Sequence, residues 1–206
     1  MFTGLIEAVG TVAELKTAAS GFRIRIQTSL AADLSPGDSL AVNGVCLTVI
    51  AADGRRSARR HRSRDGTGHH AGSMRGEQQV NLERPMRADG RVGGHFVQGH
   101  IDGTGIVEEI RPDGDSHWLT ISFDRSLSPY LDSQGLDRGG RREPDGGGLG
   151  GNVFDAMIIP FTWSNTALSS LKVRERVNIE CDMIGSYVAR AIELTEDGRL
   201  KPAPTT

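Results

Sequence analysis

The chain has 206 residues, enough for one or two domains that each bury a core. Its 24 basic and 26 acidic residues nearly cancel, so no overall field favours nucleic acid or an anionic membrane. No apolar run approaches a spanning helix, the N-terminus lacks the basic region of a signal peptide, and the two cysteines show no CxxC spacing. These features predict a cytoplasmic protein without a nucleic-acid or membrane partner.

Alternation of apolar and polar residues predicts several short strands, because successive side chains of a strand point to opposite faces. Turn residues such as Asn43-Gly44 separate these strands. Many short strands between glycine-rich turns are typical of small antiparallel barrels. The expected strands or apolar runs lie at residues 22–27, 40–42, 45–49, 119–123 and 153–159.

Near the C-terminus the apolar period becomes that of a helix. Apolar residues recur at Ile184, Tyr187, Val188, Ala191 and Ile192, which places them on one face of a helix. Such a stripe needs a partner, and two partners are open: the chain's own barrel or another subunit. The proline-containing residues after this helix are expected to form a frayed tail.

Two repeated motifs in the sequence indicate an internal duplication. Phe2-Thr-Gly-Leu-Ile-Glu-Ala-Val-Gly-Thr-Val12 recurs at residues 96–107 with one extra residue before the shared glycine, and Val80-Asn-Leu-Glu83 recurs as Val177-Asn-Ile-Glu180. The offset of about 95 residues is too long for a solenoid repeat and suits a duplicated small domain. We therefore expect four parts: barrels at residues 1–95 and 96–183, a helix at 184–196 and a tail at 197–206.

Two stretches lack a strand period and are expected to form long polar loops. Residues 54–71 hold six arginines and three histidines, and residues 136–151 hold seven glycines. An arginine run could also contact nucleic acid, but no aromatic residues interleave it. His61, His69 and His70 could bind a metal, but no acidic or cysteine partner lies at ligand spacing.

Five motifs, in order along the chain, resemble riboflavin synthases of the alpha-chain type. The resemblance runs from residue 1 to about residue 195 and includes the duplication. It implies an all-β fold of two tandem six-stranded antiparallel Greek-key barrels plus a C-terminal helix. The motifs are Met1-Phe-Thr-Gly-Leu-Ile-Glu7, Val42-Asn-Gly-Val-Cys-Leu-Thr-Val49, Val80-Asn-Leu-Glu-Arg-Pro-Met86, Gly93-Gly-His-Phe-Val-Gln-Gly-His-Ile-Asp102 and Val177-Asn-Ile-Glu180.

The resemblance also implies a reaction. Members of this family dismutate two molecules of 6,7-dimethyl-8-ribityllumazine, one giving a four-carbon unit to the other, to yield riboflavin and 5-amino-6-(D-ribitylamino)uracil. No metal or redox cofactor is expected, because the ring is the electron sink. The family forms homotrimers whose active site lies between the first barrel of one subunit and the second barrel of its neighbour. Lumazine synthase is a further candidate partner.

By position, the resemblance assigns roles to individual residues. His100 is the candidate for proton transfer, because imidazole titrates nearest neutral pH, and Cys46 is the candidate nucleophile or polar contact at ring C7. Ser39, Thr48 and Asp182 match other polar residues of the interface site. The first lumazine is expected at Gly4, Leu5, Ile6, Cys46, Leu47 and Thr48, and the second at Gly99, His100, Ile101, Gln134 (in place of a common Lys), Ile159, Pro160, Phe161 and Thr162.

Structural roles compete with these assignments. Cys46 could be a small buried strand residue, His100 a hydrogen-bonded structural residue, and Asp182 only the cap of the C-terminal helix. The glycines at 99, 103 and 105 do not form a dinucleotide loop, since no strand precedes them and no helix follows.

The two aperiodic stretches stand where the family carries strand and pocket segments. Residues 135–148, back-translated into GC-rich codons and read one nucleotide out of phase, give S-I-A-V-D-G-V-S-L-T-V-A-G, the family's counterpart of residues 40–49. Residues 59–72 similarly give a segment with the family's E-T element. We hypothesise compensated frameshifts, in the gene or in its reading. Phe161 also replaces the family's Glu. A non-catalytic lumazine- or flavin-binding protein, an inactive frameshifted form and a ligand-free structural protein are the alternatives.

Overall fold

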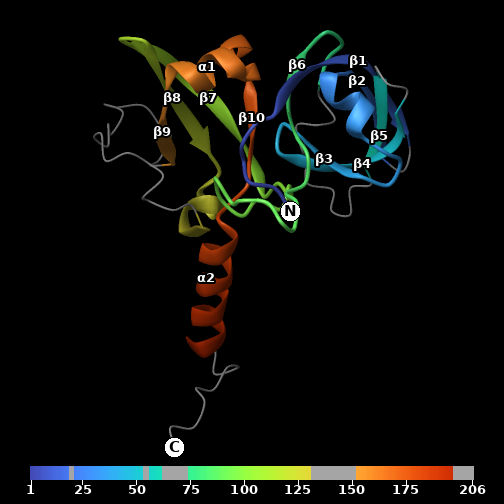
Figure 1. Cartoon of the computed structure of the whole chain (residues 1–206). Helices are drawn as coiled ribbons and strands as arrows, with labels where there is room; N and C mark the ends of the chain where they lie inside the picture. The colour runs from blue at the N-terminus through green and yellow to red at the C-terminus, as the bar shows by residue number, and fades with distance from the viewer. Residues whose placement is uncertain (19–20, 53–55, 62–73, 131–151, 197–206) are drawn as a thin grey trace, which may run out of the picture.

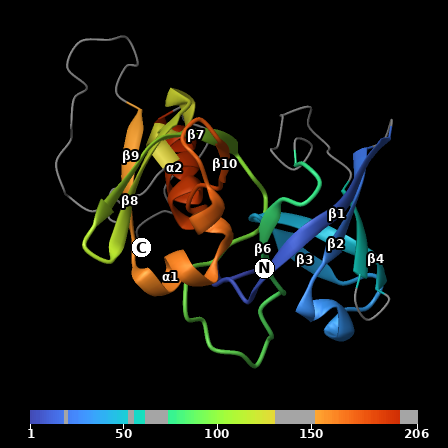
Figure 2. The same ribbon diagram turned by 90° about the horizontal axis from the view of Figure 1, so that it is seen from above.

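The computed structural model describes residues 1–18, 21–52, 56–61, 74–130 and 152–196. Its strands form two modules that lie side by side, with the N-terminal segment between them (Figure 1 and Figure 2). The last helix extends away from both modules (Figure 1).

The first module is a closed barrel of six strands in the order β1-β2-β5-β4-β3-β6, and every pairing in it is antiparallel. Alternate residues point inward: Phe22, Ile24 and Ile26 are buried, whereas Arg23 and Arg25 are exposed. A short 3-10 helix, η1 (Ser29–Asp33), follows the second strand. The strands are β1 (Ala8–Ala18), β2 (Gly21–Gln27), β3 (Ser39–Val42), β4 (Val45–Ala52), β5 (Arg56–His61) and β6 (Gln79–Glu83).

Asn43-Gly44 makes the predicted two-residue turn between β3 and β4. Both residues have positive φ, 46° and 81°, while Val42 pairs with Val45 across the hairpin. Asn and Gly tolerate this left-handed conformation best, and the turn's twist matches that of the strands. The turn therefore fixes the register of β4, which carries Cys46.

The second module is a four-stranded antiparallel sheet in the order β10-β7-β8-β9 within the described residues. Its strands are β7 (Gly103–Asp113), β8 (Ser116–Phe123), β9 (Val153–Ile158) and β10 (Arg176–Ile179). Helix α1 (Pro160–Asn165) and the 3-10 helices η3 (Arg125–Tyr130) and η4 (Ala167–Ser170) accompany them, and α2 (Met183–Glu196) follows β10.

The two modules repeat each other in detail. A β-bulge lies between Val12 and Glu14 where β1 pairs with β2, and another between Val107 and Glu109 where β7 pairs with β8. A close packing point recurs as well. A Cβ on Gly10 would lie 2.6 Å from Ile26 Cγ2, and one on Gly105 2.5 Å from Ile121 Cγ2.

The modules meet at a bridge between Phe2 and Val97, which each lie two residues before the shared glycine of their repeat, Gly4 or Gly99. The Phe2 N–H donates to the Val97 carbonyl at 2.7 Å, and the Val97 N–H donates to the Phe2 carbonyl at 3.0 Å. These two bonds form an antiparallel hydrogen-bonded pair, which is locally twofold in its geometry. Phe2 is fully buried at this junction.

Three expectations are corrected or left open. Residues 56–61, expected in a polar loop, form β5, because backbone pairing with both β2 and β4 outweighs their lack of an apolar period. The expected second six-stranded barrel is not confirmed, since the described residues of that module contribute four strands. Helix α1 was not expected; Pro160 at its first position begins a turn too short to show a helical period. Residues 54–55, 62–71 and 136–151 of these two stretches lie outside the described residues.

The apolar stripe of α2 is exposed. Ile184, Tyr187, Val188 and Ile192 keep 54–69% of their accessible surface. The interpretation that this stripe packs on its own barrel is therefore wrong, because the helix extends away from both modules (Figure 1). No helix in the described ranges has the length and hydropathy of a membrane span.

Candidate functional site

A segment of the second module, residues 98–101, lies against the first module's strand β4; we call it the Gly99 segment. The Cys46 N–H donates a hydrogen bond to the Gly99 carbonyl at 2.8 Å. A Cβ on Gly99 would lie 2.7 Å from Cys46 Cβ and 2.9 Å from Cys46 N. Gly99 also has a φ of +78°. Only glycine satisfies both the close approach and the backbone angle.

Ile101 anchors the other end of this segment by packing against the first module's core. His100 lies between the two anchors and is exposed. The structure thus brings Cys46 and His100, which are far apart in the sequence, to one place at the module junction.

Strand alternation decides which β4 residues face this junction. Leu47 is 1% exposed and lies in the barrel core, whereas Cys46 is partly exposed and Thr48 exposed on the outer face. Ser39 on β3 pairs with Thr48 across the sheet. Cys46, Thr48 and Ser39 thus belong to the outer wall of the barrel, and Leu47 supports that wall from inside.

The Glu180 carboxylate holds the Gly99 segment from the opposite side. Its Oε1 accepts the Gln98 N–H at 2.6 Å and its Oε2 accepts the Gly99 N–H at 2.9 Å. Two successive backbone N–H groups directed at one anion form a nest. Burial raises the pKa of Glu180, while these two hydrogen bonds oppose the rise; the nearby Asp102 raises it further and His100 lowers it.

A cavity of about 250 Å³ adjoins the Gly99 segment on the Glu180 side. The described residues that line it come from residues 98–102, from Glu180 and Cys181 just after β10, and from the first turns of α2. Its polar groups include the Asp102 and Glu180 carboxylates, the His100 imidazole and the Arg190 guanidinium. Cys46 does not line it, because the Gly99 peptide lies between them.

Cys181, in the wall of this cavity, is not a nucleophile at neutral pH. Burial, followed by the charge of Asp102 and a hydrogen bond to it, raises the pKa of the Cys181 thiol to about 12. The thiolate is the reactive form, so a thiol held protonated is inert. The Cys181 N–H donates to Asp102 Oδ2 at 2.8 Å, which fixes the carboxylate in place.

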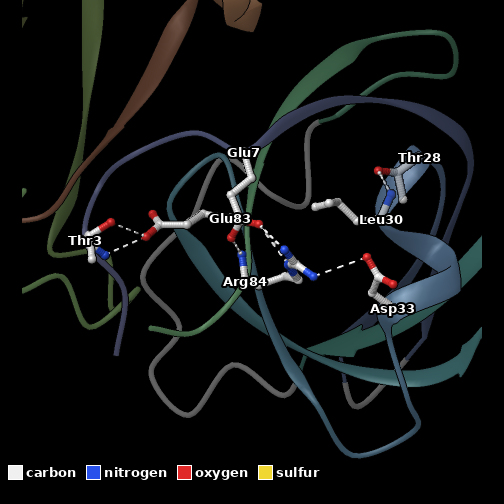
Figure 3. A network of polar contacts seen from close by, with 7 residues as sticks. All are labelled: Thr3, Glu7, Thr28, Leu30, Asp33, Glu83 and Arg84. Carbon is white, nitrogen blue, oxygen red and sulfur yellow. Dashed lines mark hydrogen bonds and ion pairs between the residues drawn. The ribbon is translucent and has the colours of Figure 1, made fainter. Parts of the chain in front are cut away.

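The first module has an equivalent clamp, shown in Figure 3. Glu83 Oε1 accepts the N–H and the hydroxyl of Thr3, and Glu83 Oε2 accepts the Gly4 N–H at 3.0 Å. Gly4 has a φ of +80°, close to that of Gly99. Next to this clamp, Arg84 forms an ion pair with Glu7 at 2.8 Å and a second with Asp33 at 3.3 Å (Figure 3).

This chain is similar to known proteins in both sequence and fold. Residues 3–85 match the model of the lumazine binding domain. The riboflavin synthase of Actinobacillus pleuropneumoniae is 37% identical over 91% of this chain and 88% of its own length. The riboflavin synthase of Bacillus subtilis is 34% identical over 100% of this chain and 96% of its own. The chain belongs to the riboflavin synthase family.

Solved structures support the fold of this riboflavin synthase family member. LumP complexed with riboflavin superposes with a TM-score of 0.72 at 18% identity, over 88% of this chain and 99% of LumP. LumP complexed with 6,7-dimethyl-8-(1'-D-ribityl) lumazine superposes with a TM-score of 0.70 at the same identity and coverage. At this identity the likeness establishes the fold.

Gly4, Leu5 and Ile6, which the family resemblance assigned to the first lumazine, lie in the N-terminal segment before β1. Gly4 and Leu5 adjoin residues 93–97: a Cβ on Gly4 would lie 3.6 Å from Val97 Cγ2, and one on Gly93 would lie 3.2 Å from Leu5 Cδ1. Ile6 is partly buried and Leu5 is 54% exposed. The Gly99 segment contacts Cys46 of the first module. It was expected to share a pocket with residues 159–162.

Residues 159–162 lie at the other end of the second module. Ile158 pairs with His117, which in turn pairs with Pro112 near the far end of β7, whereas Gly103 begins that strand beside the Gly99 segment. Nine residues of strand span roughly 30 Å. Ile159 and Phe161 are exposed at 50% and 74%. One chain therefore does not bring residues 159–162 to His100. Gln134 lies outside the described residues.

Asp182 has the geometry of a helix cap. Its Oδ1 accepts the Gly185 N–H at 2.7 Å, and its carbonyl accepts the Ser186 hydroxyl and N–H at the start of α2. The side chain is exposed and is absent from the cavity lining. Its structural role is thus visible, and its role in catalysis stays a prediction.

The two clamping glutamates were not among the expected site residues. Their signal was present, because Glu83 and Glu180 end the two copies of the Val-Asn-x-Glu echo that defined the duplication. A carboxylate at the same place in both copies, each at the end of a strand, could have marked them. Among the described residues no group of three or more His, Cys, Asp and Glu side chains could hold a metal ion, and the alternative at His61, His69 and His70 lies outside the described side chains.

Proposed function

We propose that this protein is a riboflavin synthase, which transfers a four-carbon unit between two molecules of 6,7-dimethyl-8-ribityllumazine. The observation that carries the proposal is the contact of Gly99 with Cys46, because it places His100 and Cys46, from different modules, at one junction. The similarity to riboflavin synthases over 91–100% of the chain supports it.

The reaction suits a site built from backbone edges and a few polar side chains. The two products together contain all the atoms of the two substrates, so the balance needs no oxidant, reductant or hydrolytic water. The protein has to hold two flat rings face to face and move protons. We assign proton transfer at the C7 methyl group to His100 and the contact at ring C7 to Cys46. Ser39 and Thr48 supply hydroxyl groups on the same barrel wall, and Asp182 stands at the start of α2.

We place the first lumazine at Gly4, Leu5, Ile6, Cys46, Leu47 and Thr48. The second would use Gly99, His100 and Ile101 together with Gln134 and residues 159–162. The separation of residues 159–162 from His100 within one chain supports a site completed by a neighbouring subunit. The exposed stripe of α2 supports a homotrimer assembled through these helices.

We further propose the division into residues 1–95, 96–183, 184–196 and 197–206, with the reciprocal Phe2–Val97 bridge at the junction. A cytoplasmic location fits the two free cysteines, since disulfides are rare in reducing compartments. Association with lumazine synthase, which would supply the substrate directly, is proposed from the family resemblance.

The test is incubation of the purified protein with 6,7-dimethyl-8-ribityllumazine while riboflavin fluorescence is followed. We expect riboflavin and the pyrimidine product in equal amounts, with turnover lost in H100A and C46A. Unchanged lumazine fluorescence on titration would contradict any pteridine-binding function. Sedimentation of the wild type against a variant with Ile184→Lys and Tyr187→Lys tests the trimer.

A non-catalytic lumazine- or flavin-binding protein is the second candidate. The departures from the family at 54–71 and 136–151 favour it, because the family's counterpart of Cys46-Leu47-Thr48 belongs in the latter stretch. Binding of lumazine without turnover would establish it. Resequencing of the gene and an intact mass would then decide whether compensated frameshifts produced this inactive form.

A further inference from the structure

The strongest unassigned feature of the site is the Glu180 clamp. Its two carboxylate oxygens accept two successive N–H groups, at Gln98 and Gly99, with distances of 2.6 and 2.9 Å. Hydrogen bonds from N–H groups to an ionised carboxylate are about twice as strong as those between neutral groups. Both oxygens are needed, since each accepts from a different peptide.

The clamped peptide contacts both candidate catalytic residues. Gly99 precedes His100, and the Gly99 carbonyl accepts the Cys46 N–H at 2.8 Å. A displacement of this peptide would therefore move His100 and its distance from Cys46 together. Ile101 anchors only the C-terminal end of the segment, against the first module's core.

We propose that Glu180 is a positioning residue for the riboflavin synthase reaction: its carboxylate holds the Gln98–Gly99 peptides and thereby sets the position of His100 relative to Cys46. The inference rests on the proposed function for its catalytic consequence. The role assigned to Glu180 is exerted through the Gly99 segment, by its two hydrogen bonds to the Gln98 and Gly99 N–H groups. Glu83 holds Thr3 and Gly4 in the same way and provides a matched comparison within the same chain.

The substitution E180Q keeps the shape of the side chain but turns one oxygen into an N–H₂ donor, which opposes one of the two backbone N–H groups. We expect amide hydrogen exchange at Gln98 and Gly99 to accelerate, while exchange at Thr3 and Gly4 stays as in the wild type. E83Q is expected to give the reverse pattern. Unchanged exchange at Gln98 and Gly99 in a folded E180Q would overturn the clamp.

The kinetic readout separates positioning from general structural damage. In E180Q we expect kcat to fall roughly tenfold to a hundredfold, because a small misplacement of a reacting group has effects of this size, while KM changes less than about threefold. E180D retains the charge but withdraws the carboxylate by one methylene group. It should resemble E180Q if position matters, and activity at the wild-type level in E180D would contradict the proposal. E109Q, at an exposed site on β7, is the control for glutamate replacement.

The pH profile adds a readout that a purely structural residue would not move. Because burial raises the pKa of Glu180, wild-type kcat should fall on mild acidification as the carboxylate protonates, and E180Q should lack this limb. A limb retained in E180Q would belong to another group of the same site. The titratable and charged groups around Glu180 are His100, Asp102, Cys181, Tyr187 and Arg190.

The two proposals fail in different ways. If the wild type produces no riboflavin, the proposed function fails, and amide exchange still decides whether Glu180 clamps the segment. If the wild type turns over and E180Q matches it in kcat, the function stands and the positioning role fails. If E180Q does not fold, E180D carries both the exchange and the kinetic tests.

Discussion

The two modules descend from one sequence pattern but differ beside their glutamate clamps. In the first module Arg84 follows Glu83 and forms ion pairs with Glu7 and Asp33 (Figure 3). In the second, Cys181 follows Glu180, and its N–H donates to Asp102, the equivalent of Glu7. An ion-paired arginine, partly exposed, stands in one copy where the other has a small buried thiol.

The second clamp also has a cavity beside it, lined in part by α2. Beside Cys181 there is space between the Gly99 segment and α2, and the Asp102 and Glu180 carboxylates border it. Glu83 is only 5% exposed, whereas Glu180 is partly exposed beside the cavity. The two modules thus keep the same backbone clamp, but the glutamate is buried in the first and partly exposed in the second.

The largest expected effect tests the two equivalent glycines of the clamps. G99A and G4A both place a Cβ in the left-handed region, at a cost of about 1–2 kcal/mol. Only G99A also collides with the Cys46 backbone, since the corresponding contact of G4A is 3.6 Å. We expect riboflavin formation to fall on the order of a hundredfold in G99A, at least tenfold more than in G4A. Equal losses would contradict the special role of the Gly99–Cys46 contact.

The next effect tests the repeated packing point in the two sheets. G10A and G105A would push a methyl group against Ile26 and Ile121, at 2.6 and 2.5 Å, and each should lower the free energy of unfolding by about 2 kcal/mol. G76A is the control, because no atom lies within 4 Å of its Cβ. Chemical denaturation measures all three. A much smaller loss in G105A would show that the second sheet yields more easily than the closed barrel.

A smaller effect tests the Arg84–Cys181 difference. R84A should cost about 0.5–1 kcal/mol, because the arginine is partly exposed and surface ion pairs contribute little. This loss should shrink in high salt, which screens such pairs. C181A should show no salt dependence, since a thiol with a pKa of about 12 is uncharged at neutral pH. Denaturation at two ionic strengths gives the comparison, and a salt-independent loss in R84A would show that its packing dominates.

The smallest expected effect concerns the pH dependence of stability at Glu180. A carboxyl group whose folded-state pKa is raised contributes most to stability below its unfolded-state pKa and loses that contribution as the pH rises through the folded value. The stability of the wild type relative to E180Q should therefore be greater near pH 4 than at about pH 7. Urea denaturation at both values checks the sign. The opposite trend would mean that the two N–H groups outweigh burial.

The sequence was sufficient to predict elements whose formation depends on residues close together in the chain. The Asn43-Gly44 turn, the inward face of β2 and the C-terminal helix follow from residue type and period, and the structure confirms all three. The β5 strand was missed for the opposite reason. This strand forms by backbone pairing with β2 on one side and β4 on the other. The residue types at 56–61 show no apolar period that would predict it.

The sequence alone determined the duplication and, through it, the family, because two copies of one pattern survive at a constant offset. The family resemblance placed Cys46, Leu47 and Thr48 together in one pocket, and the structure showed that Leu47 points into the barrel while Cys46 and Thr48 point out. Only the tertiary structure decided that the Gly99 segment of one module lies on Cys46 of the other. That contact depends on how two folded bodies dock around Phe2 and Val97, and no periodicity within either body encodes their mutual orientation.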